Sequence, residues 1–172
     1  EGMEFHGIVI ATLFKESVLR FTTRLDKMQI PYVLIDAFIE NTHCLAYYGT
    51  NSFNSGYIAA KLMYQQIGPD DKLAVFRFIR KGDSCSTQVL KREEGFRTYL
   101  DENHFRGTIY PVHIHADDNE GNRNILDSFF LLHGDVKAGI IFNSRVHVLG
   151  DYFKARKKKD FKLIGYDILD EN

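Results

Sequence analysis

Three apolar, strand-like runs in the sequence are each followed directly by polar side chains that could hold a ligand. Asp36 follows the first run, Asn143 and Ser144 follow the second, and Asp167 follows the third. At the carboxyl ends of parallel strands, such groups can exchange hydrogen bonds with neighbouring hydroxyls of a polyhydroxylated molecule. Each of them, taken alone, is more simply interpreted as a cap of the helix that follows. Three such strand ends in one chain make a shared polar site as reasonable as capping, without naming the ligand.

Arg92 is a second candidate for ligand binding, because a planar guanidinium can donate two hydrogen bonds to adjacent sugar oxygens or to a carboxylate. Side-chain chemistry alone favours an ion pair with Glu93 or Glu94 on a solvated helix face instead. Catalysis has weaker support. Asp36 and Asp167 could act as general acid and base only if they approached each other, and the chain has no phosphate-binding loop, nucleophile elbow or dinucleotide-binding glycine motif. We therefore expect a binding protein and not an enzyme.

His113 and His115 suggest a zinc site, because side chains two residues apart share one face of a strand, and Asp117 follows them. No third or fourth ligand stands at a suitable spacing, so surface or cleft-rim histidines are the favoured interpretation. The basic run 156–159 is expected to be the solvated C-terminal end of a helix, where cations interact favourably with the helix dipole. The sequence thus predicts no metal and no cofactor.

Apolar, β-branched runs alternate with segments of helical period along the whole chain. Strands are predicted at residues 7–13, 32–35, 73–78, 108–114, 138–142 and 162–165. Helices are predicted at residues 15–28, 55–67, 86–103, 120–133 and 146–156. Continuous hydrophobic strands separated by helix-length connections indicate parallel sheets covered by helices on both faces. The predicted fold class is α/β.

The segment from Ala37 to Asn54 interrupts this alternation. We interpret it as a short extra strand followed by a crossover between two lobes. The helix after it is predicted to be capped by Ser52 or Asn54 and to end at Gly68-Pro69. Its apolar positions recur at the spacing of one helix face: Ile58, Ala59, Leu62, Met63 and Ile67.

Length and charge restrict the class of protein further. The 172 residues, 44% of them hydrophobic and 26% charged, suit one ordinary domain or two small lobes that share a cleft. A formal net charge of −1 gives no overall field for nucleic acid, so any DNA-binding part must be local or lie elsewhere. No apolar run is long enough to span a membrane. Cys44 and Cys85 match no metal or redox spacing, and we interpret them as buried free thiols compatible with a reducing compartment.

Four short motifs follow one another in a specific order: Ile30–Asp36, Asn51–Ala60, Arg92–Phe96 and Ile164–Asp167. In this order they resemble the effector-binding core of the LacI–GalR repressors, which is shared with type I periplasmic sugar-binding proteins. The resemblance extends over nearly the whole chain. It implies two α/β lobes around an effector cleft, with a partial N-terminal lobe at residues 1–50 and most of the C-terminal lobe at residues 51–172. The chain also enters a strand-like run almost at once, which we interpret as the start of a piece cut from a longer protein.

The resemblance also implies which residues contact the effector. They are Asp36 from the N-terminal lobe, Asn51 near the crossover, and Arg92 and Asp167 from the C-terminal lobe. The Asn-Asp pair that usually follows the fifth strand is altered here, so either Asn143 or Ser144 would make that contact. Three aromatic residues are candidates either to stack on a sugar ring or to belong to the core: Tyr48, Phe53 and Phe142.

The function implied by the resemblance is that of the ligand-sensing core of a bacterial transcriptional regulator, which binds a small sugar or sugar derivative. Operator DNA would be bound only through a helix-turn-helix domain that lies outside this chain. The full-length protein would be a cytoplasmic homodimer. A periplasmic sugar-binding protein for transport or chemoreception is the alternative.

Overall fold

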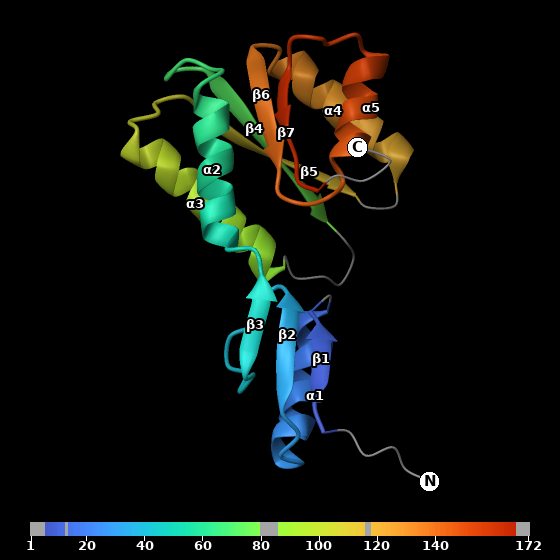
Figure 1. The fold of residues 1–172 in the computed structure, drawn as a ribbon. Helices are drawn as coiled ribbons and strands as arrows, with labels where there is room; N and C mark the ends of the chain where they lie inside the picture. Colours follow the sequence, from blue (N-terminus) through green and yellow to red (C-terminus); the bar gives the residue numbers. More distant parts are fainter. Residues whose placement is uncertain (1–5, 13, 80–85, 116–117, 168–172) are drawn as a thin grey trace.

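The computed structural model describes residues 6–12, 14–79, 86–115 and 118–167, and these residues form two parallel β-sheets (Figure 1). The first sheet has the order β1-β2-β3, with β1 at Ile8–Ala11, β2 at Tyr32–Asp36 and β3 at Ala46–Gly49. Helix α1 (Lys15–Lys27) connects β1 to β2 and packs on one face of this sheet.

The second sheet has the order β5-β4-β6-β7, and its neighbouring strands are all parallel. Its strands are β4 (Lys72–Ile79), β5 (Ile109–His115), β6 (Val136–Ile141) and β7 (Lys162–Ile164). Its helices are α2 (Ser52–Tyr64), α3 (Thr87–Glu102), α4 (Asn119–Leu132) and α5 (Val146–Ala155). Helices α2 and α3 cover one face, and α4 and α5 cover the other (Figure 1). The predicted α/β class, with parallel sheets flanked by helices, is confirmed.

The second sheet has a hydrophobic core on each face, because its central strands are apolar at successive positions. Phe76 and Ile141 point toward α4 and α5, whereas Val75 and Ile140 point toward α2 and α3. All four side chains are almost completely buried. Burial on both faces explains why β4 and β6 read as continuous hydrophobic runs and not as alternating ones.

Helices α2 and α3 touch backbone to backbone, because each has a glycine where they meet. A Cβ added at Gly56 would lie 1.8 Å from the carbonyl oxygen of Arg92, and one added at Gly95 would lie 2.0 Å from that of Phe53. Neither position has room for a side chain. This contact fixes where α3, and Arg92 on it, lies relative to α2.

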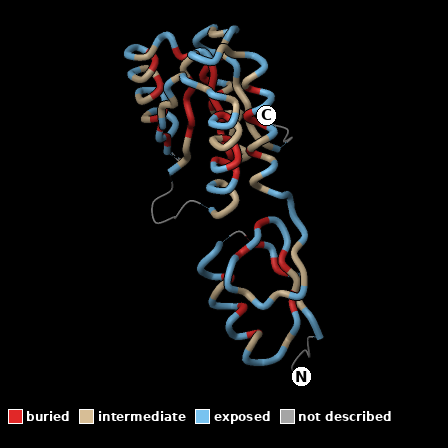
Figure 2. Tube along the Cα trace, turned by 90° about the vertical axis from the view of Figure 1, so that its left-hand side faces the viewer, coloured by how far each residue is buried: buried red, intermediate tan, exposed pale blue. Residues whose placement is uncertain are grey.

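The first sheet has one covered and one bare face within the residues that the structure describes. Leu34 points toward α1 and is fully buried, but Val9 is 66% exposed, Ile35 36% and Tyr48 71%. Ile35 and Tyr48 are paired in register on neighbouring strands, so they share the bare face. Figure 2 shows the buried positions of this sheet interrupted by exposed ones. Parallel sheets are usually covered on both faces, so this apolar surface is unusual.

Elements agree with the sequence-based expectation to within a few residues, and the largest differences concern α2. This helix begins at Ser52 and is capped by Asn51, whose Oδ1 accepts a hydrogen bond from the backbone N–H of Asn54 at 2.9 Å. The expected caps, Ser52 and Asn54, are therefore wrong. The helix also ends at Tyr64, ahead of the expected stop at Gly68-Pro69.

The single buried face expected for α2 is only partly correct. Ala59 and Met63 are buried, but Ile58 is 56% exposed and Leu62 is 50% exposed. Both exposed side chains line an apolar cavity of about 440 Å³ between α2 and the end of β7. The helical spacing identified apolar positions correctly, but it did not show how far the covering sheet extends.

The extra strand expected between Ala37 and Asn54 is β3. The division into residues 1–50 and 51–172 falls between β3 and α2, and it remains a proposed boundary. In the described part of the chain, no helix combines the length and the hydropathy needed to cross a bilayer.

Candidate functional site

Arg92 of α3 is only 5% exposed and reaches the carboxyl ends of β6 and β7. Its Nη1 donates a hydrogen bond to the carbonyl oxygen of Phe142 at 2.8 Å, and its guanidinium carbon lies 4.0 Å from the centre of the Tyr166 ring. Its Nε is buried and has no hydrogen-bond partner among the described residues. A buried donor without a partner is costly, so this position favours an additional acceptor from water or from a ligand.

The ion pair with an adjacent glutamate, which side-chain chemistry alone favoured before the family resemblance made Arg92 a ligand contact, is not formed among the described residues, because Glu93 and Glu94 have other partners. Glu93 accepts hydrogen bonds from Nε of Arg77 at 3.0 Å and from Nε of Arg97 at 2.9 Å, while Glu94 pairs with a lysine of the same helix. Burial raises the pKa of Glu93, but the two arginines outweigh burial and leave that pKa below its usual value. The pair between Arg77 on β4 and Glu93 on α3 ties the helix to the sheet directly beside Arg92.

The polar residues predicted at the ends of β6 and β7 lie next to the groups that hold Arg92. Asn143 and Asp167 each directly follow one of the two residues in contact with the guanidinium. Oδ1 of Asn143 accepts a hydrogen bond from the backbone N–H of Arg145 at 3.0 Å and so closes the turn into α5. Ser144 lies within this turn. Which of Asn143 and Ser144 contacts a ligand stays a prediction.

Asp36 lies at the carboxyl end of β2, in the other sheet, with a φ of 82°. The hydroxyl of Tyr47 donates a hydrogen bond to the carbonyl oxygen of Asp36 at 2.9 Å. Burial raises the pKa of the Tyr47 phenol, the negative charge of Asp36 raises it further, and the positive charge of Arg92 lowers it. The charges of Asp36, at the end of β2, and of Arg92, on α3, therefore both act on one phenol.

A cavity of about 320 Å³ opens where the loops after β2 and β3 meet the N-terminal ends of α2 and α3. Its lining comes from both sides and includes Phe38, Glu40, Tyr47, Asn51, Phe53, Gln88 and Lys91. The volume is near the lower end of the range of about 300–1,000 Å³ typical of small-molecule sites. Carboxylate, amide, ammonium and aromatic groups around such a space suit reversible binding of a small, oxygen-rich molecule.

The three aromatic candidates for stacking have different positions. Phe53 is half-buried and lines the cavity, with its ring centre 6.4 Å from that of Tyr57. Phe142 is 1% exposed and packs edge-to-face against Phe96 at 5.6 Å between ring centres, so it belongs to the core. Tyr48 lies on the bare face of the first sheet. Of the three, Phe53 is the ring that a ligand in this cavity can contact.

Asn51 lines the cavity and caps α2 at the same time, so one of its acceptor positions is already used by the helix. Across the residues described, no group of three or more His, Cys, Asp or Glu side chains could hold a metal ion. His113 and His115 occupy exposed positions of β5, and Asp117 lies outside the described residues. Cys44 is a half-buried free thiol, and Cys85 is also outside the described residues.

Sequence reasoning missed several residues of this region. Tyr166 was part of a recognised motif, but nothing in the sequence indicated that its ring would support Arg92. Tyr47 could have been found from strand alternation, because it must face the opposite side of β3 from Tyr48. Lys91 had no comparable local signal, since it reaches the cavity only through the packing of α3 beside the first sheet.

Comparisons with known proteins agree with this architecture. Residues 3–172 match the family model of the periplasmic binding protein domain. A crystal structure from Bacteroides fragilis, provisionally assigned as a LacI transcriptional regulator, is 41% identical with a TM-score of 0.89, and the match covers 97% of this chain and 58% of that one. No match is found among curated proteins.

Two sugar-binding proteins share the fold at much lower identity. GanP, a glucose-galactose binding protein from Geobacillus stearothermophilus, is 18% identical with a TM-score of 0.76, and the match covers 96% of this chain and 58% of GanP. A solute-binding protein from Burkholderia graminis, solved in complex with D-arabinose, is 16% identical with a TM-score of 0.78. The match covers 96% of this chain and 57% of that protein. At such identities these two likenesses show the fold alone. The chain spans less than two thirds of the length of each of these three structures.

The family model covers nearly the whole chain, and the order of strands and helices is the one that the sequence motifs implied. The chain therefore belongs to the periplasmic binding protein domain family, and its architecture is that of a LacI-type effector-binding core.

Proposed function

We propose that this chain is the ligand-sensing core of a LacI-type bacterial transcriptional regulator and binds a small sugar or sugar derivative in a cleft between its two sheets. The observation that carries the proposal is Arg92, which is buried where β6 and β7 end and whose Nε has no hydrogen-bond partner in the part of the chain that the structure describes. The identity of 41% to a protein provisionally assigned as a LacI regulator supports it. In this proposal the full-length protein is a cytoplasmic homodimer that binds operator DNA through a helix-turn-helix domain outside these residues.

Effector binding acts, in this proposal, by stabilising one relative orientation of the two sheets. A ligand that binds two orientations equally well shifts neither, so it must contact both sides of the cleft. Asp36 supplies a contact from the first sheet, and Arg92 and Asp167 supply contacts from the second. The reorientation changes the spacing of two DNA-binding domains in a dimer and thereby their fit to two half-sites.

The effector site is tested by titration calorimetry with D-glucose, D-galactose and D-arabinose, after a thermal-shift screen of the same sugars. Arg92→Ala and Asp167→Ala are each expected to weaken binding by at least about tenfold, because each removes hydrogen bonds to a charged group. Arg92→Lys keeps the charge but loses the two-pronged geometry, so it is expected to weaken binding as well. Arg20→Ala, on the exposed side of α1, is the control and is expected to bind like the unmodified chain.

Circular dichroism of each variant separates loss of binding from loss of structure. Unchanged sugar affinity in folded Arg92→Lys and Asp167→Ala would refute the site. Binding of none of the three sugars by the unmodified chain would refute these three sugars as effectors.

A periplasmic sugar-binding protein is the second candidate, favoured by the folds of GanP and of the arabinose-bound protein from Burkholderia graminis. The coding sequence upstream of Glu1 distinguishes the two. A helix-turn-helix there supports the regulator, and a signal peptide there supports the periplasmic protein.

A further inference from the structure

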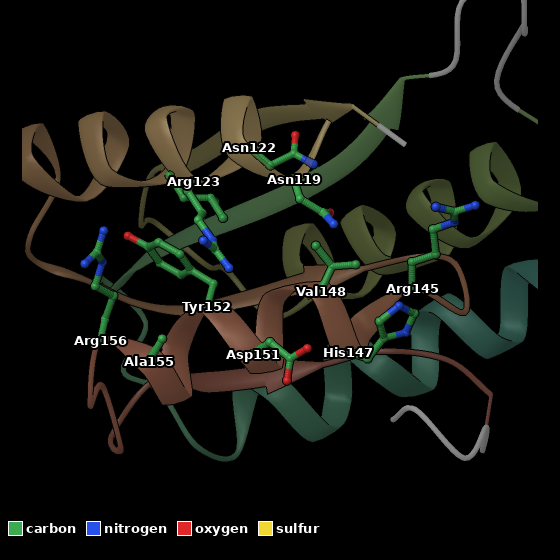
Figure 3. Close-up of a pocket in the computed structure, with 11 residues that line it drawn as sticks. Asn119, Asn122, Arg123, Arg145, His147, Val148, Asp151, Tyr152, Ala155 and Arg156 are labelled. Carbon is green, nitrogen blue, oxygen red and sulfur yellow. The ribbon is translucent and has the colours of Figure 1, made fainter. Parts of the chain in front are cut away.

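A separate polar cavity of about 540 Å³ lies between α4 and α5 (Figure 3). These helices pack on the face of the four-stranded sheet opposite to α2 and α3, so this cavity is distinct from the one at the N-terminal ends of α2 and α3. Three guanidinium groups line it: Arg123 of α4, Arg145 immediately before α5, and Arg156 immediately after α5. Among the described residues that line it, Asp151 provides the one carboxylate. The cavity therefore has an excess of positive charge.

The three arginines differ in their local partners. Arg156 is paired with Asp127, which also accepts a hydrogen bond from the hydroxyl of Tyr152 at 2.9 Å. Arg123 is exposed and has no hydrogen bond or ion pair among the described residues. The guanidinium carbon of Arg145 lies 5.5 Å from the centre of the Phe78 ring. Since a guanidinium has five N–H donors, Arg145 can bind an anion in addition to its present contacts.

Arg123 and Arg145 stand apart, with Asn119, Asn122 and Val148 between them in Figure 3. Figure 3 shows Arg145 at one end of the cavity and Arg123 beside Tyr152 toward the other. Leu126 and Val148 contribute apolar lining. An anion that contacts both arginines must therefore extend along the cavity. An elongated molecule with an anionic group at each end matches both the charge and its spacing.

We propose that the cavity between α4 and α5 binds a small organic molecule with two separated anionic groups, one held by Arg123 and the other by Arg145. The body of the molecule lies against Leu126 and Val148. Joining two charged groups by a short linker makes the second contact intramolecular, so a linked pair binds more tightly than either group alone. This site is independent of the effector cleft and of whether the chain senses sugars.

The test is calorimetric titration of the chain with hexane-1,6-diol bisphosphate at low salt. This probe has two separated phosphates, and its apolar linker offers no sugar hydroxyls to the effector cleft. It is expected to bind at least about tenfold more tightly than hexyl phosphate, and hexane-1,6-diol is expected not to bind. Inorganic pyrophosphate is highly charged but short, so it is expected to bind no better than hexyl phosphate.

Variants locate the site. Arg123→Gln and Arg145→Gln are each expected to reduce the affinity for the bisphosphate to that for hexyl phosphate, a loss of about tenfold or more. Arg20→Gln, an exposed arginine on α1, is the matched control and is expected to leave the affinity unchanged. Equal affinity for pyrophosphate and the bisphosphate would indicate general attraction to a positive surface and would overturn the proposal. Failure of the bisphosphate to bind, or binding that survives both variants, would also overturn it.

Discussion

Glu93 offers the sharpest test of how Arg92 is held in place. Its side chain is 8% exposed and forms charged hydrogen bonds with Arg77 on β4 and with Arg97 one turn further along α3. Glu93→Gln keeps the shape of the side chain but removes its charge. The amide NH2 group must then face a guanidinium that can only donate, so at least one of the three hydrogen bonds is lost.

The expected loss of stability follows from the exposure of the partners. Removing one partner of a fully buried ion pair costs about 3–5 kcal/mol. Here the Arg77 side chain is 32% exposed and that of Arg97 is 41% exposed, so water can solvate both after the change. We therefore expect a loss of about 2 kcal/mol, close to the value of one hydrogen bond to a charged group. For a chain of this length, that corresponds to a decrease in Tm of about 4–8 °C.

The assay is thermal and urea unfolding followed by circular dichroism, with Glu94→Gln as the control. Glu94 is adjacent and pairs with an exposed lysine, so its loss is expected to cost less than about 0.5 kcal/mol. Because the folded pKa of Glu93 is lowered, its contribution is fully present above the usual glutamate value of 4.5 and is lost as the pH falls through the folded value. The difference in the free energy of unfolding between the unmodified chain and Glu93→Gln is thus expected to disappear at acidic pH. Equal stabilities of the two glutamine variants at pH 7 would refute this reasoning.

Two further predictions concern α2 and its contact with α3. Gly95→Ala is expected to lower the free energy of unfolding by about 1–3 kcal/mol in urea, because the new Cβ would lie 2.0 Å from the carbonyl oxygen of Phe53. This loss is expected even though alanine is the better helix former. A stabilised variant would show that α2 and α3 can move apart without cost. Asn51→Ala is expected to cost about 1 kcal/mol through loss of the N-cap, while Ser52→Ala is expected to be nearly neutral. A larger loss of stability for Ser52→Ala than for Asn51→Ala in the same assay would show that Ser52 is the cap.

Hydrophobic periodicity predicted the elements well, because burial on both faces of the larger sheet leaves continuous apolar runs at β4 and β6. It failed where the outcome depends on distant residues. Ile58 and Leu62 have the spacing of a buried face, but α2 packs on the sheet through Ala59 and Met63 and leaves the other two exposed. No local pattern shows how far a helix face is covered.

The candidate site shows the same limit. Local chemistry paired Arg92 with its neighbouring glutamates, but Glu93 is instead bound by Arg77, which lies sixteen positions earlier in the chain and reaches it through the packing of α3 on β4. The family resemblance replaced the expected ion pair by a ligand contact for Arg92, because the order of the motifs reflects contacts between residues that are distant in the sequence. Helix capping by Asn51 was missed for a simpler reason, since Asn51, Ser52 and Asn54 near the start of α2 offered competing caps.

The uncovered apolar side of β1, β2 and β3 also affects how this polypeptide behaves in water. Val9, Ile35 and Tyr48 form an exposed apolar surface through which copies of the chain can associate. In concentrated solution the chain is therefore expected to self-associate through these residues, and a polar replacement such as Val9→Thr should reduce that association without disturbing the proposed ligand cleft.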